Sequence, residues 1–362
     1  MFKDSARELG TLRFSREKLQ RRNVTLDVKH FEDCEQLFIS IGRSYTVEAL
    51  LEFFEMKTLE DSPHKHLPPR PDLLPDQSSK KEYFDKTMEK FIDEFLSPVL
   101  TFDDDCQQEC DVQSDEESCN TDFVRNYSLR LLQYFFIMAD IKDAVKEGNG
   151  LRLHQIHKQL LHHFKSDSGY NAYAIEMIIN IIQNEVLLSE QEAQQCIWSA
   201  TANWPGGKGR NIEIDLLQEN CNKDLKNLIK EMGANKTDKA IYRASRAVGG
   251  IQHIVENLNV QSSNKPSSGS HTHKASVPDE LKILKDLREL RPFLTQPGRA
   301  HSSFPSISTN PLKTINTKEF KTWLQRDKKY LLHDIPTEEE ANEVYITTII
   351  KHEVQCMFFI EP

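Results

Sequence analysis

A glycine-rich basic loop and two acidic residues stand close together in the sequence. The loop PGGKGR, at 205–210, carries Lys208 and Arg210, and Asp215 and Glu219 follow it four residues apart. On a helix, residues four apart share one face. Protein-bound Mg²⁺ commonly takes one or two carboxylates together with water. The spacing is therefore compatible with a phosphate-binding turn that leads into a metal-binding helix face.

Neither pattern is specific. A Walker loop has Ser or Thr after its lysine, whereas Gly209 follows Lys208, and no GxGxxG fingerprint occurs. The two acids also fit the solvated face of an amphipathic helix. Its opposite face carries Leu217, Cys221, Leu225, Leu228 and Met232. We favour a surface loop and a solvated helix face, and we expect no cofactor, with Mg²⁺ entering only under a nuclease alternative.

A row of basic residues follows at helical spacing. Lys236, Lys239, Arg243 and Arg246 fall on one side of a predicted helix, beside an apolar stripe. Together with Lys208 and Arg210, this row could follow a nucleic-acid backbone through phosphate contacts. Ordinary surface helices carry lysine and arginine as well, so both interpretations stay open here.

The histidine and cysteine patterns give weaker indications of a functional site. His154, His157, His162 and His163 lie within ten residues, but zinc requires three or four convergent ligands and no second pair follows at motif spacing. We expect them to be core or surface histidines and name no metal site. Cysteine occurs at positions 34, 106, 110, 119, 196, 221 and 356. These seven residues contain no CxxC pair, a pattern that predicts reduced thiols. Neither GxSxG nor HExxH occurs.

The elements that must position these residues are mainly helical. Apolar periodicity predicts a multi-helix bundle with long polar linkers, and 344–360 is the best candidate for a strand. The predicted segments are an N-terminal helical segment at 1–56, a proline-rich linker at 57–81, a helix at 82–101, an acidic disordered insertion at 102–121, a helical core domain at 122–260, a serine-rich linker at 261–277 and a C-terminal segment at 278–362. Ser189 with Glu192 predicts a capping box.

Composition narrows the class of protein. The 362 residues carry a net charge of −10, so the chain is no polycation and any nucleic-acid contact must be local. Its N-terminus lacks the apolar core of a signal peptide, and its longest apolar stretches are too short to cross a bilayer. We therefore expect an intracellular protein without a membrane partner. Ser114, followed by three acids, fits an acid-directed phosphorylation site, a pattern that is common by chance.

Several segments, in their order and identity, resemble an uncharacterised eukaryotic family, the domain of unknown function 6589. The strongest are GRNIEIDLLQEN and GANKT, and the resemblance runs from about Leu9 to Leu331. It implies a transposable-element origin. Longer members carry an upstream Asp-Gln-Leu-Thr segment that would supply the first acid of an RNase-H-like nuclease core, with Glu219 as a late acid of a two-metal site. A few strands of such a core would then remain.

This chain begins just before LGTL and has no Asp-Gln-Leu-Thr segment. We therefore expect a copy truncated at its N-terminus and without catalysis, because one helical acid cannot hold two metal ions. The first hypothesis is a non-catalytic, transposon-derived helical protein, nuclear in location, that binds nucleic acid or another protein. The alternatives are a metal-dependent nuclease or transposase fragment that uses Glu219 with Asp215, and a helical interaction scaffold without nucleic-acid binding.

Overall fold

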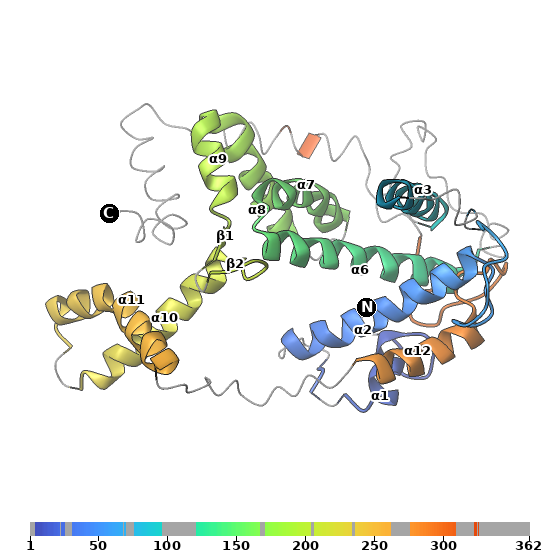
Figure 1. Cartoon of the computed structure of the whole chain (residues 1–362), viewed down its shortest axis with the longest axis horizontal. Coiled ribbons are helices and arrows are strands. Elements are labelled where there is room, and N and C mark those ends of the chain that lie inside the picture. Colours follow the sequence, from blue (N-terminus) through green and yellow to red (C-terminus); the bar gives the residue numbers. More distant parts are fainter. Residues whose placement is uncertain are drawn as a thin grey trace. The chain divides into compact units, whose positions relative to one another are not determined.

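A computed structural model gives the arrangement of the elements in space (Figure 1). It describes residues 4–21, 23–25, 31–67, 69, 76–95, 121–166, 171–203, 206–233, 236–261 and 276–308, with 322, 323 and 325. Nearly all of the acidic insertion at 102–121, including Ser114, lies outside the described residues, as do most of the serine-rich linker and the strand candidate at 344–360. The chain divides into two compact units. Unit 1 is Met1–Asp140 with His273–Asn316, and unit 2 is Ile141–Thr272 with Thr317–Pro362.

The prediction of a mainly α fold is confirmed. The described residues form ten α-helices, one π-helical turn and two strands of two residues each. The strands β1 (Thr201–Ala202) and β2 (Ile212–Glu213) pair antiparallel, with Thr201 opposite Glu213. The described part of the chain contains no other sheet, so the strands expected from an RNase-H-like core are not found there. In that part, too, no helix is both long enough and apolar enough to cross a bilayer.

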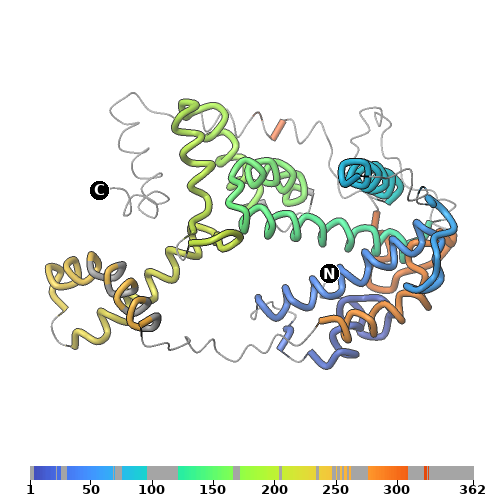
Figure 2. Tube along the Cα trace, in the orientation of Figure 1, coloured from blue at the N-terminus to red at the C-terminus, as the bar shows by residue number. Residues whose placement is uncertain are grey.

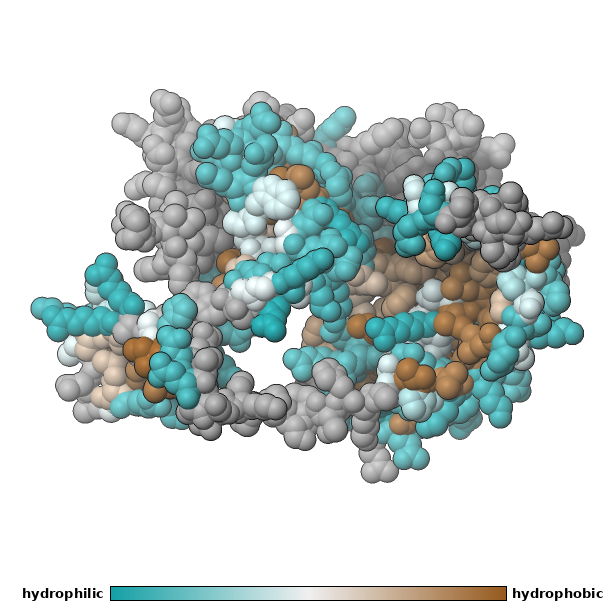
Figure 3. Space-filling model, viewed as in Figure 1, coloured by the Kyte–Doolittle hydropathy of each residue, from teal (hydrophilic) through white to brown (hydrophobic). Residues whose placement is uncertain are grey.

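The centre of unit 1 is α2 (Phe31–Phe53). Its buried apolar residues recur every four positions, at Leu37, Ile41, Tyr45 and Ala49, which is the pattern of a helix with one face in a core. Helix α12 (Val277–Leu290) packs against it although more than two hundred residues separate the two (Figure 2). Figure 3 shows apolar residues gathered along α2 and the neighbouring part of α6 (Phe123–Glu147).

The remaining helices of unit 1 are α1 (Leu12–Lys18) and α3 (Gln77–Phe95), and both pack on α2. Helix α3 begins five residues before the helix predicted at 82–101. Beyond the serine-rich linker, α12 shares a compact unit with the N-terminal helices. The segment boundaries proposed from the sequence otherwise stay a prediction.

Ion pairs connect distant parts of unit 1. Asp122, 6% exposed, accepts hydrogen bonds from the Nε and Nη2 atoms of Arg299 at 3.0 and 2.6 Å. Glu48, fully buried, accepts from the Nη1 of Arg288 at 2.9 Å, and Arg291 forms a two-bond pair with Glu52. These arginines lie in α12 or just after it, so they fasten the returning chain to α2 and to the start of α6.

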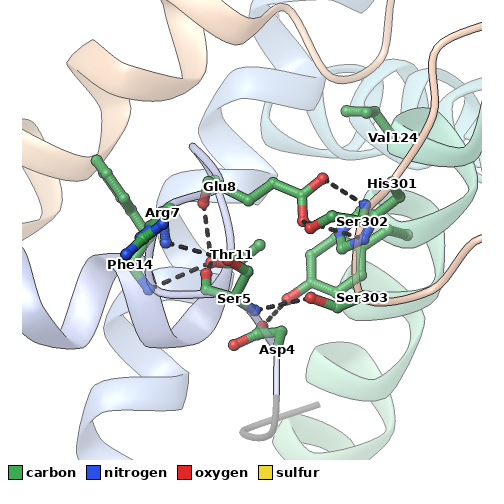
Figure 4. A network of polar contacts seen from close by, with 12 residues as sticks. Asp4, Ser5, Arg7, Glu8, Thr11, Phe14, Val124, His301, Ser302 and Ser303 are labelled. Atoms are coloured by element: carbon green, nitrogen blue, oxygen red, sulfur yellow. Dashed lines mark hydrogen bonds and ion pairs between the residues drawn. The ribbon is translucent and has the colours of Figure 1, made fainter.

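A polar network fixes the N-terminal segment of unit 1 (Figure 4). Asp4 is 1% exposed and accepts hydrogen bonds from the backbone N–H of Leu12 and Arg13, both at 3.0 Å, and from the Tyr127 hydroxyl at 2.7 Å. Figure 4 shows the adjoining contact, in which Glu8 accepts from the backbone N–H and the hydroxyl of Ser302. Burial raises the pKa of Asp4. The network anchors the turn before α1 to a loop almost three hundred residues away.

Unit 2 contains a layer of helices and a helical hairpin made of α10 (Ile214–Glu231) and α11 (Asp238–Gln261). The layer is made of α7 (Gly150–Ser166), α8 (Asn171–Ile182), the π-helical turn η3 (Gln183–Leu187) and α9 (Glu190–Trp198), and α7 packs against both α8 and α9. The predicted capping box of Ser189 and Glu192 is present. Gly150 permits the close approach of α9, because a Cβ there would lie 2.0 Å from the carbonyl oxygen of Ile197.

Candidate functional site

The basic loop connects the two strands. Gly206 and Gly207 have φ values of 71° and 94°, which glycine adopts at low cost, and the Asn203 side chain donates to the Gly207 carbonyl at 2.7 Å. Lys208 and Arg210 are exposed at the tip of this hairpin. In a phosphate-binding loop the turn runs directly into a helix, whose N-terminal N–H groups face the anion. Here β2 intervenes before α10, so the geometry favours the surface loop that we expected.

Helix α10 (Ile214–Glu231) has the two faces that the sequence predicted. Asp215 and Glu219 are exposed, whereas Leu217, Cys221, Leu225, Leu228 and Met232 are half-buried. Burial raises the pKa of the Cys221 thiol and the nearby Asp224 raises it further, which is opposite to what an activated nucleophile requires. No group of three or more His, Cys, Asp or Glu side chains within the described ranges is placed to hold a metal ion. Asp215 and Glu219 therefore have no further ligands there.

Helix α11 (Asp238–Gln261) packs against α10 and carries the basic row. Lys236, just before the helix, and Lys239, Arg243 and Arg246 are all exposed. The Thr237 hydroxyl accepts from the backbone N–H of Ala240 at 3.3 Å and so caps the helix. As far as the structure describes the chain, none of the four cations is held in an ion pair. Their charges therefore face solvent.

An aromatic side chain lies within the basic row. Tyr242 is 56% exposed, and the guanidinium of Arg246 lies over its ring, 5.1 Å from the centroid. Ala240, Ile241 and Ala244 are half-buried on the other side of the helix, whereas the side chains of Ala247, Val248 and Ile251 lie outside the described residues. Exposed aromatic rings beside arginine are a common surface for stacking unpaired bases. The sequence pattern had singled out the cations but not Tyr242.

Two of the four histidines, His154 and His157, form hydrogen bonds to the neighbouring α8–η3 segment. His154 is 6% exposed, with its Nε2 3.1 Å from the carboxylate of Glu185, and His157 Nδ1 is 3.3 Å from the Asn180 side-chain oxygen. Burial lowers the pKa of His157. His154 is thus a buried histidine paired with a carboxylate. The sequence did not indicate these partners, because they come from the next helix and match no ligand motif.

Comparison with known proteins identifies the family of this chain. The model of a family of unknown function (DUF6589) matches residues 1–271. The chain belongs to this family. No curated protein and no solved structure matches it.

The DUF6589 match includes the loop, α10 and α11, and with them every residue proposed above for a site. It ends before α12, so the resemblance between 272 and about Leu331 has no support from this match. Even so, α12 contributes Ile283 and Leu287 to the core around α2. The DUF6589 chain therefore packs its N-terminal helices against a segment that lies beyond the matched region.

Proposed function

We propose that this DUF6589 protein binds nucleic acid through the exposed face of α11, assisted by the loop at 206–210. The observation that carries the proposal is a row of four exposed cations: Lys236 just before α11, and Lys239, Arg243 and Arg246 along one side of the helix. At helical spacing they rise along one side of a rod, so a phosphate backbone can contact several of them at once. We do not assign catalysis to this face.

The charge of the surrounding segment supports the proposal. Between 206 and 246 the chain has nine lysines and arginines and six aspartates and glutamates, a balance of +3 in a chain of net charge −10. The remainder of the chain is therefore strongly acidic and would repel phosphates. Local attraction within an acidic protein directs an anionic ligand to one surface.

A salt-titrated binding assay on the full chain tests the proposal. Lys239→Glu with Arg243→Glu should weaken binding of a short oligonucleotide. It should also reduce the slope of log K against log salt by about two, roughly one for each lost phosphate contact. Lys80→Glu with Lys81→Glu makes the same charge change on exposed residues of α3 and serves as the control. Equal slopes for both double variants would refute the site, and an absence of binding by the native chain would favour the scaffold alternative.

The nuclease alternative stays testable on the same protein. Two-metal cleavage needs carboxylates from several elements, and the described residues bring none to Asp215 and Glu219. Nicking of plasmid DNA that requires Mg²⁺ and disappears in Glu219→Gln would establish this function against our preference. The Glu213→Gln variant, which alters an exposed acid of β2, controls for the loss of one negative charge.

We infer the origin of the chain from the family resemblance alone. A transposable-element source, and a nuclear location for a protein that binds nucleic acid, both belong to this proposal. The test of origin is genomic: near-identical copies at many loci, flanked by repeats, would support it. A single locus conserved in position among related species would count against it.

A further inference from the structure

One cavity in unit 2 has polar walls contributed by three successive helical segments. Its volume is about 80 Å³, and α7, the α8–η3 segment and α9 all line it. Its polar lining consists of His154, His157, Asn180, Gln183, Asn184 and Cys196. Among the described residues that line it, none is a lysine, arginine, aspartate or glutamate. A cavity of this kind binds through hydrogen bonds from neutral groups.

The π-helical turn η3 places an amide against this cavity. Asn184 is 8% exposed, and its Nδ2 donates to the backbone carbonyl of Asn180 at 2.8 Å. A carbonyl only accepts, so the NH₂ end of the amide must face it and the Oδ1 end is the acceptor that remains. This Oδ1 is buried and has no hydrogen-bond partner among the described residues. Single π-turns inside helices occur frequently at binding sites.

His154 supplies a second buried polar atom. Its Nε2 lies 3.1 Å from the Glu185 carboxylate, which only accepts, so Nε2 carries a proton and Nδ1 is the ring nitrogen that remains. That Nδ1 is also buried without a partner within the described ranges. A hydrogen bond from Lys158 holds the pKa of Glu185 below its usual value, so the carboxylate stays ionised and continues to accept from Nε2.

His157 supplies a second acceptor. Its Nδ1 lies 3.3 Å from the Asn180 side-chain oxygen, which again requires the proton on Nδ1. Burial lowers the pKa of His157, so the ring is neutral near pH 7 and its Nε2 accepts. The side chains of Asn184 and His157 therefore bring two acceptors to one small cavity, which the buried Nδ1 of His154 adjoins.

A ligand that fits this lining is a compact, neutral hydrogen-bond donor. A charged ligand would lose its hydration without meeting an opposite charge on the lining, which is unfavourable. An NH₂ group donates two hydrogens from a single atom and so satisfies two acceptors in little space. The volume is that of a few heavy atoms, since a water molecule takes about 30 Å³ of the liquid. We propose that the cavity is a binding site for a small neutral ligand of the primary carboxamide or urea class.

Ligand binding can be detected at Cys196, because this exposed thiol lines the cavity. Its alkylation by N-ethylmaleimide is followed by peptide mass spectrometry on the full chain, with Cys221 of α10 as the internal reference. Acetamide should slow alkylation of Cys196 in a saturable manner, while N,N-dimethylacetamide, which has no N–H, should leave the rate unchanged. Equal protection by both compounds, or none at roughly molar acetamide, would overturn the proposal and leave a merely hydrated cavity.

A variant tests the acceptor itself. Asn184→Leu keeps the size of the side chain and removes the buried Oδ1, and it should reduce acetamide affinity about tenfold, the value of one hydrogen bond. Gln194→Leu, an exposed position of α9, is the matched control. Circular dichroism checks that both variants fold.

A measurement on the native chain avoids the variants altogether. Acetamide should shift the ¹⁵N resonance of His157 Nε2, because this nitrogen gains a donor. A resonance that does not move would overturn the proposal whatever the variants do.

Discussion

Glu48 makes the stability of unit 1 depend on pH. Its carboxyl group is fully buried in α2; Arg288 bonds one oxygen at 2.9 Å, and the other has no partner among the described residues. Burial raises its pKa from 4.5 to about 7, even though Arg288 acts in the opposite direction. Because the folded pKa is the higher one, this group contributes stability that is fully present below about pH 4.5 and lost as pH rises through about 7.

The size of the effect follows from the two pKa values. The difference between 4.5 and about 7 corresponds to on the order of 3 kcal/mol of unfolding free energy. Glu48→Gln imitates the protonated carboxyl and removes this dependence. We therefore expect the variant to be close to the native chain near pH 4.5 and more stable than it above about pH 8, by up to about 3 kcal/mol.

Urea denaturation at several pH values measures this difference. The three tryptophans, Trp198, Trp204 and Trp323, all belong to unit 2, so their fluorescence follows that unit. Far-UV circular dichroism detects the helices of both units, and the part of its transition that fluorescence does not share reports unit 1. Glu32→Gln, an exposed position of α2, controls for removal of one acid. A constant gap between Glu48→Gln and the native chain across this pH range would refute the reasoning.

Three further predictions concern single contacts. Asp122→Asn should destabilise unit 1 by about 1.5–3 kcal/mol in the same denaturation assay, because the half-buried guanidinium of Arg299 loses the charged hydrogen-bond acceptor of the buried carboxylate. Gly42→Ala should lower stability by about 1–3 kcal/mol, since the new Cβ would lie 2.1 Å from the Phe135 ring; an unchanged midpoint would contradict that packing. Under the proposed function, Tyr242→Ala should lower the affinity for single-stranded DNA by about tenfold, as measured by fluorescence anisotropy. The affinity for a duplex should be nearly unaffected, because only unpaired bases can stack on the ring.

Local features of this fold could be predicted from the sequence. Apolar periodicity indicated a helical segment at 1–56, where α2 lies, and a helical domain at 122–260, and Ser189 with Glu192 indicated the start of α9. The two faces of α10 and the row of cations on α11 also followed from spacing. These features are local because each helical hydrogen bond joins residues four apart, so a short window of sequence contains the relevant information.

Contacts between distant segments could not be predicted in this way. The pairing of α12 with α2, the bond from Arg299 to Asp122 and the approach of Glu185 to His154 join residues between about thirty and more than two hundred positions apart. No spacing in one chain indicates such partners, since they depend on which helix faces pack together. The sequence by itself determined the helices, the family and the position of the basic row. Only the tertiary structure decided that this row is exposed and that two acceptors meet in one cavity, because exposure and convergence are properties of packed elements.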